Sequence, residues 1–407
     1  MKKRKLTDLA IAVALGAAAA VLYFCSMAGY VYPGESAHLT AVWNGLDLQP
    51  FNQYPLMAPF AKFFGAGNVI APVCGAIAVA LVYFIVVRLM RLRIKGDETE
   101  GFSFPASRFG GMVAAVVFML NPAVRSAASH LEPRMFDLAW ALAAMAMFIP
   151  CLEPGRPVVW LFASASGAMA GLGLADTPLF LLALPLYLAA AWAVSRRRGG
   201  NGYSLAALFL VVYLAAFFVF AGNAAGDFGA LLKSLRDATR AYTAPKDWLF
   251  VLFFSTLPFA VSLFSGRRAF TEQSGWTQWL FHLAMTFVSV LAIATPLSPA
   301  SLMRPSGILP VAAVAFAAIT AGYLAVYWYL QFSAAVRINE SKVAERGAPR
   351  RIGRLLACVA GGVLAVAIVF TVLLDFFAFE RNAGAFADKV AEKVIADLGD
   401  QIGRAHV

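Results

Sequence analysis

Residues 69–90 read VIAPVCGAIAVALVYFIVVRLM, and this stretch decides the class of fold. Its one charged residue is Arg88, which stands near its C-terminal end. An apolar run of about 20 residues is long enough to cross the hydrocarbon core of a bilayer as an α-helix. A helix satisfies all of its backbone hydrogen bonds internally, which lipid requires. The stretch therefore predicts a membrane-spanning helix.

The rest of the chain has the same apolar character. Its 407 residues are 61% hydrophobic and 14% charged, and the mean hydropathy is +0.74. Soluble domains carry about 25% charged residues, so this composition requires lipid as part of the solvent. The net charge of +11 does not indicate nucleic-acid binding, because the basic residues stand in short clusters between apolar runs. The cysteines show neither metal-ligand nor disulfide spacing.

Similar runs recur along the sequence and predict an all-α, polytopic membrane protein with about eleven spanning helices. They are placed near 8–29, 69–90, 109–124, 135–152, 158–175, 178–195, 205–222, 248–265, 277–296, 307–331 and 355–377. Two of the connecting segments, 29–68 and 223–247, are long. Both contain apolar residues at helical spacing, so we expect interfacial helices in them, in the first and fourth outer loops. Examples are Leu231, Leu232 and Leu235.

The distribution of Lys and Arg predicts the orientation. With the N-terminus in the cytoplasm, the predicted cytoplasmic segments hold 21 of the 33 Lys and Arg residues, as the positive-inside rule requires. The first span follows a basic start, Lys2 to Lys5, and resembles a signal peptide. It is long and further spans follow it, so we predict a retained signal anchor. An odd number of crossings then places the C-terminus outside.

The C-terminal region divides from the membrane domain, which we predict over 1–378. Residues 379–401 have helical periodicity and read as the start of a truncated extracytoplasmic region. The final residues, 402–407, resemble a translated sequencing adapter and are predicted to be a non-native tail. An ordinary polar tail is the alternative.

Ionisable residues at the outer face of a membrane are costly unless they are used or solvated, so each is a candidate. In the first outer loop, Glu35 and His38 stand three residues apart and share a face if a helix begins there. A carboxylate beside an imidazole can take a proton from a hydroxyl or coordinate a metal. The alternative is an interfacial helix whose polar face meets water. Tyr54, farther along, suits either a sugar ring or the membrane interface.

The next outer loop, near 125–137, carries more polar residues than a turn requires. They are Arg125, His130, Glu132, Arg134 and Asp137. Arg125 and Arg134 can bind a phosphate. The alternative is mutual salt bridging at the surface.

Two further candidates stand alone. Asp176, which precedes Thr177-Pro178, can be the N-cap of the next span. It can also face the same cavity as Glu35, because the two roles are compatible. Arg304 can hold a lipid phosphate or extend to the headgroups. The sequence contains no phosphate-binding glycine loop, HExxH or CxxC motif. We expect no cofactor; a divalent metal is compatible with the outer-loop pair but is not indicated.

These motifs resemble those of the bacterial DUF2723 proteins, which are relatives of the protein O-mannosyltransferases in the GT-C group of membrane glycosyltransferases. That family shows Asp-Ser-Gly-Glu-Leu after the first span, similar to Glu35–Leu39 here. Its next motif, His-Pro-Pro-Gly-Tyr-Pro-Leu, is similar to Gln49–Leu56. A later Glu-Val-Tyr pattern resembles Glu132-Pro133-Arg134, and the Gly171-Leu172 run before a polar pair also matches. The likeness covers residues 1–195.

The resemblance implies a GT-C-like fold in the bacterial cytoplasmic (inner) membrane, with the active site at the extracytoplasmic face. It implies transfer of a sugar from a polyprenyl-phosphate donor to an acceptor hydroxyl of a protein, lipid or glycan. Glu35, with His38 beside it, takes the place of the family's catalytic acid, and arginines would neutralise the departing lipid phosphate. The expected partners are the bilayer, that donor and an unidentified acceptor, but no nucleic acid.

Two departures from the family pattern leave the activity open. His38 stands where the family has its second acid, and Gln49 stands where it has His. Both are compatible with a different substrate or with an inactive relative. The alternative function is non-enzymatic: a carrier for a lipid-linked substrate, or a structural or assembly protein whose outer domain does the work.

Overall fold

The computed structural model describes residues 2–27, 39, 41, 54–64, 69–94, 100–153, 158–197, 203–224, 227–241, 312, 314–315, 317–323, 325–326 and 366. Within these ranges all regular structure is helical and no strand occurs. The elements are α1 (Lys2–Cys25), α3 (Met57–Phe63), α4 (Ile70–Ile94), α5 (Glu100–Leu120), α6 (Pro122–Ser129), α7 (Pro133–Leu152), α8 (Val159–Leu174), α9 (Leu179–Arg197), α10 (Tyr203–Ala224) and α11 (Phe228–Ala241). The prediction of an all-α chain is confirmed for this part.

Five of these helices are long and apolar enough to cross a membrane, which is compatible with a multi-pass membrane protein. The apolar stretches are Leu6–Cys25, Ile70–Leu92, Pro133–Leu152, Leu179–Arg196 and Tyr203–Asn223. The bent pair α5–α6 makes a sixth if it counts as one span, and α8 is a shorter apolar helix.

The first seven predicted spans coincide in sequence with these helices. The spans predicted at 248–265 and 277–296 lie outside the described residues, as does the C-terminal region 379–407. Only parts of the spans predicted at 307–331 and 355–377 are described, and the count of eleven stays a prediction.

The third predicted span, 109–124, overlaps the apolar part of α5, Pro105–Leu120, but runs past the end of that helix. The helix α5 begins earlier, at Glu100, and ends at Leu120. Asn121 is extended because it precedes Pro122, and its side chain accepts a hydrogen bond of 3.0 Å from the backbone N–H of Ala123. A new helix, α6, therefore starts here, and the direction of the chain changes by 63°.

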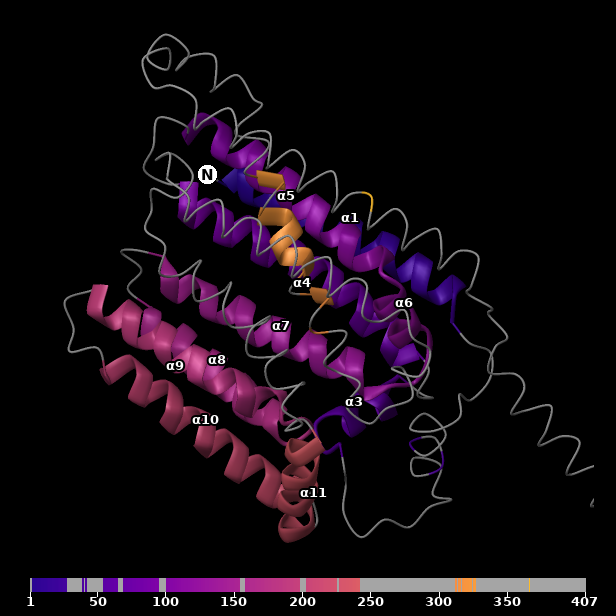
Figure 1. Cartoon of the computed structure of the whole chain (residues 1–407), viewed down its shortest axis with the longest axis vertical. Helices are drawn as coiled ribbons and strands as arrows, with labels where there is room; N and C mark the ends of the chain where they lie inside the picture. Colours follow the sequence, from indigo (N-terminus) through magenta and orange to yellow (C-terminus); the bar gives the residue numbers. More distant parts are fainter. Residues whose placement is uncertain are drawn as a thin grey trace, which may run out of the picture.

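Two buried cores hold together the bundle of helices that Figure 1 shows. In the first, α4 lies between α1, α5 and α7. The second lies between α7, α8, α9 and α10. Helices α8 and α10 approach so closely that a Cβ atom at Gly171 would overlap the carbonyl oxygen of Tyr213. Such close approach through small residues is typical of helix packing in membranes.

A late part of the sequence packs on α5. The described residues between 312 and 326 are helical, and Val314, Ala318 and Val326 are buried in the first core. A Cβ atom at Gly322 would lie 2.6 Å from the carbonyl oxygen of Gly110. Two glycines therefore bring the backbones of these helices into contact, within the region of the predicted span 307–331.

The surface helix predicted in 223–247 is present as α11. Leu231 is buried and Leu235 half-buried against the second core, whereas Leu232 is 41% exposed. In the predicted loop 29–68, the described helix is the short α3.

The two ends of the bundle differ. At the N-terminal end, Asp8 of α1 forms ion pairs with Arg91 at 2.6 Å and with Arg108 at 2.7 Å. At the same end, Arg88 pairs with Glu153 at 2.6 Å. The opposite end, which we call the distal end, consists of α3, α6, the turn 175–178 and α11 (Figure 1).

Candidate functional site

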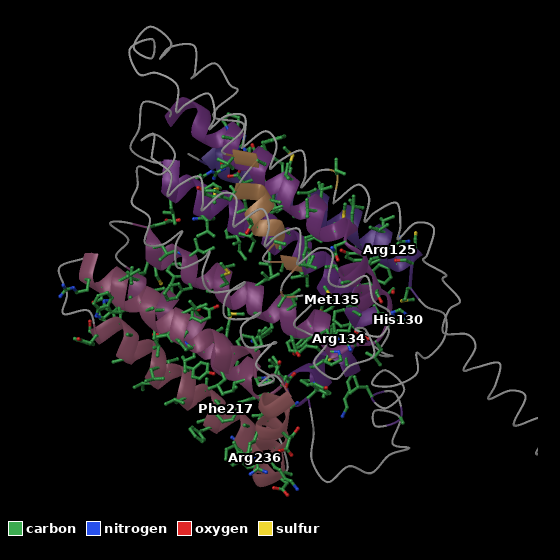
Figure 2. All side chains as sticks on the ribbon, in the orientation of Figure 1. Arg125, His130, Arg134, Met135, Phe217 and Arg236 are labelled. Atoms are coloured by element: carbon green, nitrogen blue, oxygen red, sulfur yellow. The ribbon has the colours of Figure 1, made fainter. Side chains whose placement is uncertain are left out.

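The predicted site residues that the structure describes all lie at the distal end. They are Tyr54, Arg125, Glu132, Arg134 and Asp176, together with His130 and Asp137. Figure 2 labels Arg125, His130 and Arg134 at this end of the bundle. The other three predicted site residues, Glu35, His38 and Arg304, lie outside the described residues.

Asp176 joins two distant parts of the chain. It lies in the turn between α8 and α9, and its side chain is buried. Its Oδ1 accepts a hydrogen bond from the backbone N–H of Leu56, and its Oδ2 accepts one from Met57, each at 2.8 Å. The first N–H groups of a helix have no partner within that helix. Asp176 therefore caps α3 from a position about 120 residues later in the sequence.

The interpretation of Asp176 as the N-cap of the following span is wrong. The Thr177 Oγ1 lies 3.4 Å from the backbone N–H of Leu179 and accepts its hydrogen bond, so Thr177 takes that position. The N–H of Asp176 itself continues α8 by donating to the Gly173 carbonyl. The Asp176 carboxylate thus bonds to the start of α3 instead of α9. Nothing in the local sequence could have indicated this, because Asp-Thr-Pro before an apolar run is typical of a local cap.

The surroundings of Asp176 also change its acidity. Burial raises the pKa of this carboxyl group to about 7, and the hydrogen bonds from Leu56 and Met57 oppose the rise. The group therefore titrates near neutral pH. When it is ionised, both oxygens accept hydrogen bonds from α3, whereas a protonated carboxyl group has one oxygen that carries a hydrogen.

His130 closes the corner between α6 and α7. Its Nδ1 lies 2.7 Å from the carbonyl oxygen of Ser126 and 3.1 Å from the Ser129 hydroxyl. A carbonyl only accepts, so Nδ1 carries the hydrogen. Burial lowers the pKa of His130, the hydrogen bond to Ser126 opposes this, and the charge of Arg134 lowers the pKa further. These effects favour the neutral imidazole.

Glu132 and Arg134 stand at the start of α7. The Glu132 Oε2 lies 3.4 Å from the Arg134 Nε, and the two side chains are 15% and 8% exposed. The salt-bridge interpretation therefore holds for this pair, but below the surface rather than on it. Asp137, one turn later, is also buried. The start of α7 thus places several charged groups in the interior of the distal end.

Aromatic side chains that the sequence did not single out pack α3 against α7. The ring of Phe60 lies 5.4 Å from that of Phe136 and 6.2 Å from that of Trp140, between centroids. The indole N–H of Trp140 donates a hydrogen bond of 2.7 Å to the Met169 carbonyl on α8. Aromatic residues near helix ends were the available signal, but it does not distinguish this cluster from an ordinary membrane-interface belt.

Within the parts of the chain that the structure describes, no group of three or more His, Cys, Asp or Glu side chains is placed to hold a metal ion. The pair predicted from the sequence, Glu35 and His38, lies outside the described residues.

Beside α11, the distal end therefore combines three segments that are far apart in the sequence: 54–64, 121–137 and 175–178. It gathers carboxylates, guanidinium groups and aromatic rings. Guanidinium groups can bind a phosphate, and carboxylates can orient or deprotonate a hydroxyl. Comparison of the chain with protein-family models, with curated proteins and with solved structures yields no match.

Proposed function

We propose that the chain is a GT-C-type membrane glycosyltransferase, which transfers a sugar from a polyprenyl-phosphate donor to an acceptor hydroxyl. The observation that carries the proposal is that the described residues of three motif segments lie at one end of the bundle. These are Gln49–Leu56, Glu132–Arg134 and Gly171–Asp176, which carry the resemblance after the first motif. Asp176 accepts a hydrogen bond from Leu56 of the first segment. Phe60 and Phe136 join α3 to α7, the helices next to the first and second segments.

The charge distribution supports the outer face as the place of reaction. At the N-terminal end of the bundle, the basic side chains include Arg88, Arg91 and Arg108. Under the positive-inside rule this end faces the cytoplasm, and the distal end then faces outward. In this orientation the distal residues meet a lipid-linked donor from the outer leaflet of a bacterial inner membrane.

The reaction needs a base and a site for the leaving group. In the proposal, the carboxylate of Glu35 removes the proton of the acceptor hydroxyl as its oxygen attacks the anomeric carbon of the sugar. The bond between that carbon and the phosphate oxygen breaks, and the polyprenyl phosphate leaves with the bonding electrons. Arg125 and Arg134 neutralise its charge. The proton on Glu35 then passes to water.

The experiment measures transfer from a labelled polyprenyl-phosphate sugar to acceptors of the native membrane, with the protein reconstituted in nanodiscs. We expect Glu35→Gln to lower transfer about a hundredfold or more, as loss of a general base does. Arg134→Gln should raise the KM for the donor. Asp237→Asn is the matched control, because Asp237 lies on α11 with its side chain 52% exposed, and it should leave transfer unchanged.

The outcomes separate the alternatives. Equal transfer by the wild type and by Glu35→Gln would eliminate Glu35 as the base. Absence of transfer by the wild-type chain, expressed from its full reading frame, would favour a non-enzymatic carrier or an assembly protein.

A further inference from the structure

We infer that α11 is a lipid-binding helix, which lies at the interface between bilayer and water and binds the phosphate of an anionic phospholipid through Lys233 and Arg236. The inference goes beyond the proposed function and does not depend on it, because it concerns the exposed surface of α11 and not the candidate site.

The packed and the exposed sides of α11 are distinct. Leu231 is buried against the second core. Since each residue turns the helix by about 100°, Leu232, Arg236 and Lys233 follow in that order around the helix away from Leu231. Leu232 is 41% exposed, the Arg236 side chain is 58% exposed, and Lys233 is exposed as well. One apolar and two basic side chains thus adjoin on the exposed side, which is the pattern of a helix at a membrane interface.

An exposed apolar face of α10 ends where α11 begins. Val211, Leu214 and Phe218 are exposed and follow one face of α10 at helical spacing. Such a face is typical of a surface that lipid covers. The ring of Phe218 lies 6.0 Å from that of Phe228, the first residue of α11, between centroids. The apolar face therefore leads directly to α11, which Figure 1 shows at the distal end of α10.

The opposite end of the same helices marks the other interface. Trp160 at the start of α8, Trp192 near the end of α9 and Tyr203 at the start of α10 are exposed. Exposed Trp and Tyr side chains are typical of the boundary between lipid and water. From Tyr203 the apolar stretch continues for 21 residues to Asn223, or about 31 Å of helix, which matches a hydrocarbon core of about 30 Å. Helix α11, which begins shortly after Asn223, therefore lies at the second interface.

The basic side chains of α11 select an anionic headgroup. A guanidinium group donates paired hydrogen bonds to phosphate oxygens, and an ammonium group attracts phosphate as a point charge. Arg236 also pairs with Asp237 at 3.5 Å, but both side chains are more than half exposed, and such pairs contribute little. A phosphate at the depth of the headgroups can therefore replace Asp237 as the partner of Arg236 and bind Lys233 at the same time.

The fold of α11 has support that does not involve these basic residues. The Asp227 Oδ1 accepts a hydrogen bond of 3.0 Å from the backbone N–H of Ala230 and so caps the start of the helix. Leu231 fixes the helix on the second core. Substitution of Lys233 and Arg236 should therefore leave α11 folded, so that it tests lipid binding.

The experiment is amide hydrogen exchange of the full chain in two kinds of nanodisc. One contains phosphatidylcholine alone, and the other contains equal parts of phosphatidylcholine and phosphatidylglycerol. In the wild type, phosphatidylglycerol should slow exchange within Phe228–Ala241 about fivefold or more, because a ligand that binds the folded helix suppresses its local opening. Exchange within Tyr203–Ala224 should not depend on the lipid. In the double variant Lys233→Gln, Arg236→Gln, the effect of phosphatidylglycerol on α11 should be lost.

Two control variants make the result specific. Lys233→Arg combined with Arg236→Lys keeps both charges and should keep most of the effect of phosphatidylglycerol. Arg196→Gln removes an exposed positive charge from the opposite end of the bundle, where Arg196 lies 5.6 Å over the ring of Trp192. This variant should leave the effect on α11 unchanged.

Equal exchange of α11 in both kinds of nanodisc would overturn the inference. Slowing that persists in the double glutamine variant would overturn it as well, because other groups would then bind the lipid. Inorganic phosphate added to the phosphatidylcholine nanodiscs distinguishes a lipid from a soluble ion, and equal slowing by inorganic phosphate would overturn the assignment to lipid. If the double variant also exchanges faster within α10, the single variant Arg236→Gln decides: a reduced effect of phosphatidylglycerol supports the inference, and an unchanged effect overturns it.

Discussion

The two ends of the bundle use charge in different ways. At the N-terminal end, charged side chains pair with each other: Asp8 lies between Arg91 and Arg108, and these pairs join α1, α4 and α5. At the distal end, the Asp176 carboxylate bonds instead to the backbone of α3. The first arrangement fastens spanning helices to each other. The second fastens a short connecting segment to the bundle.

This difference in bonding indicates which end of the bundle is suited to a functional site. Ion pairs between spanning helices depend on the helices alone, and they leave the connecting segments without support. A carboxylate that bonds to backbone N–H groups fixes a segment regardless of its side chains, which stay available for a ligand. Functional residues are often carried on such segments when a rigid scaffold places them. Four measurements test this contrast, and they are given from the largest expected effect to the smallest.

The stability contributed by Asp176 should depend on pH. Its pKa is about 7 in the folded protein, against an ordinary value of 3.8 for an aspartic acid side chain, so between these values the folded state binds more protons than the unfolded state. The contribution is therefore fully present below pH 4 and is lost as pH rises through 7, on the order of 4 kcal/mol in total.

The measurement is the free energy of unfolding in mixed micelles, determined for the wild type and for Asp176→Asn across this pH range. The difference between the two proteins removes the contribution of other titrating groups, including His130. The wild type should lose stability relative to the variant as pH rises. Parallel curves would show that Asp176 is not a buried titrating group.

Asp8→Asn should destabilise the N-terminal end by about 3 kcal/mol, because it leaves Arg91 and Arg108 beside each other without the carboxylate between them. Unfolding by SDS in mixed micelles measures the loss. Amide exchange at Leu56 and Met57 should stay at its wild-type rate if the two ends are independent. Faster exchange there would mean that the contact of Asp176 with α3 depends on the ion pairs.

Gly171→Ala should destabilise the protein by about 2 kcal/mol, because the added methyl group meets the Tyr213 backbone and forces α8 away from α10. The shift would move the turn that carries Asp176. The control is Gly222→Ala on α10, where a Cβ atom meets nothing within 4 Å. That change should be neutral or stabilise by about 0.5 kcal/mol, and equal losses in both variants would contradict the close packing of α8 on α10.

Arg88→Ala should have the smallest effect, about 1 kcal/mol or less. The pair of Arg88 with Glu153 is partly exposed, at 25% and 21%, and such pairs contribute little. Thermal unfolding of Arg88→Ala and of Arg88→Lys measures it. A loss as large as that of Asp8→Asn would show that this pair, too, is a structural fastening of the N-terminal end.

The long apolar helices were predictable because long apolar runs have few alternative structures in lipid. The stretch 69–90 predicted α4 closely, and the amphipathic pattern around Leu231 predicted α11. The predicted span 109–124 runs through Asn121-Pro122, although an Asn before Pro can as readily end one helix and begin another. The positions of helices thus follow from local composition, whereas their exact ends depend on caps.

The distal contacts were less accessible from the sequence. Asp176 was singled out correctly as a polar residue at an end of the bundle, but its partners are backbone atoms about 120 residues earlier. Backbone N–H groups are present at every residue except proline, so they leave no pattern that identifies them as partners. The role of Phe60 and Trp140 was missed for the same reason, because ring packing depends on how α3 lies on α7.

The contact between Gly110 and Gly322 has a consequence for the order in which the protein is made. Gly110 of α5 is synthesised more than 200 residues before Gly322, which packs on it, so the glycine face of α5 stays uncovered while the intervening chain is made. Until that segment arrives, lipid or another protein must occupy this face. The early helices therefore cannot reach their final packing one after another. Assembly is completed only when the helical segment that contains Gly322 packs against α5.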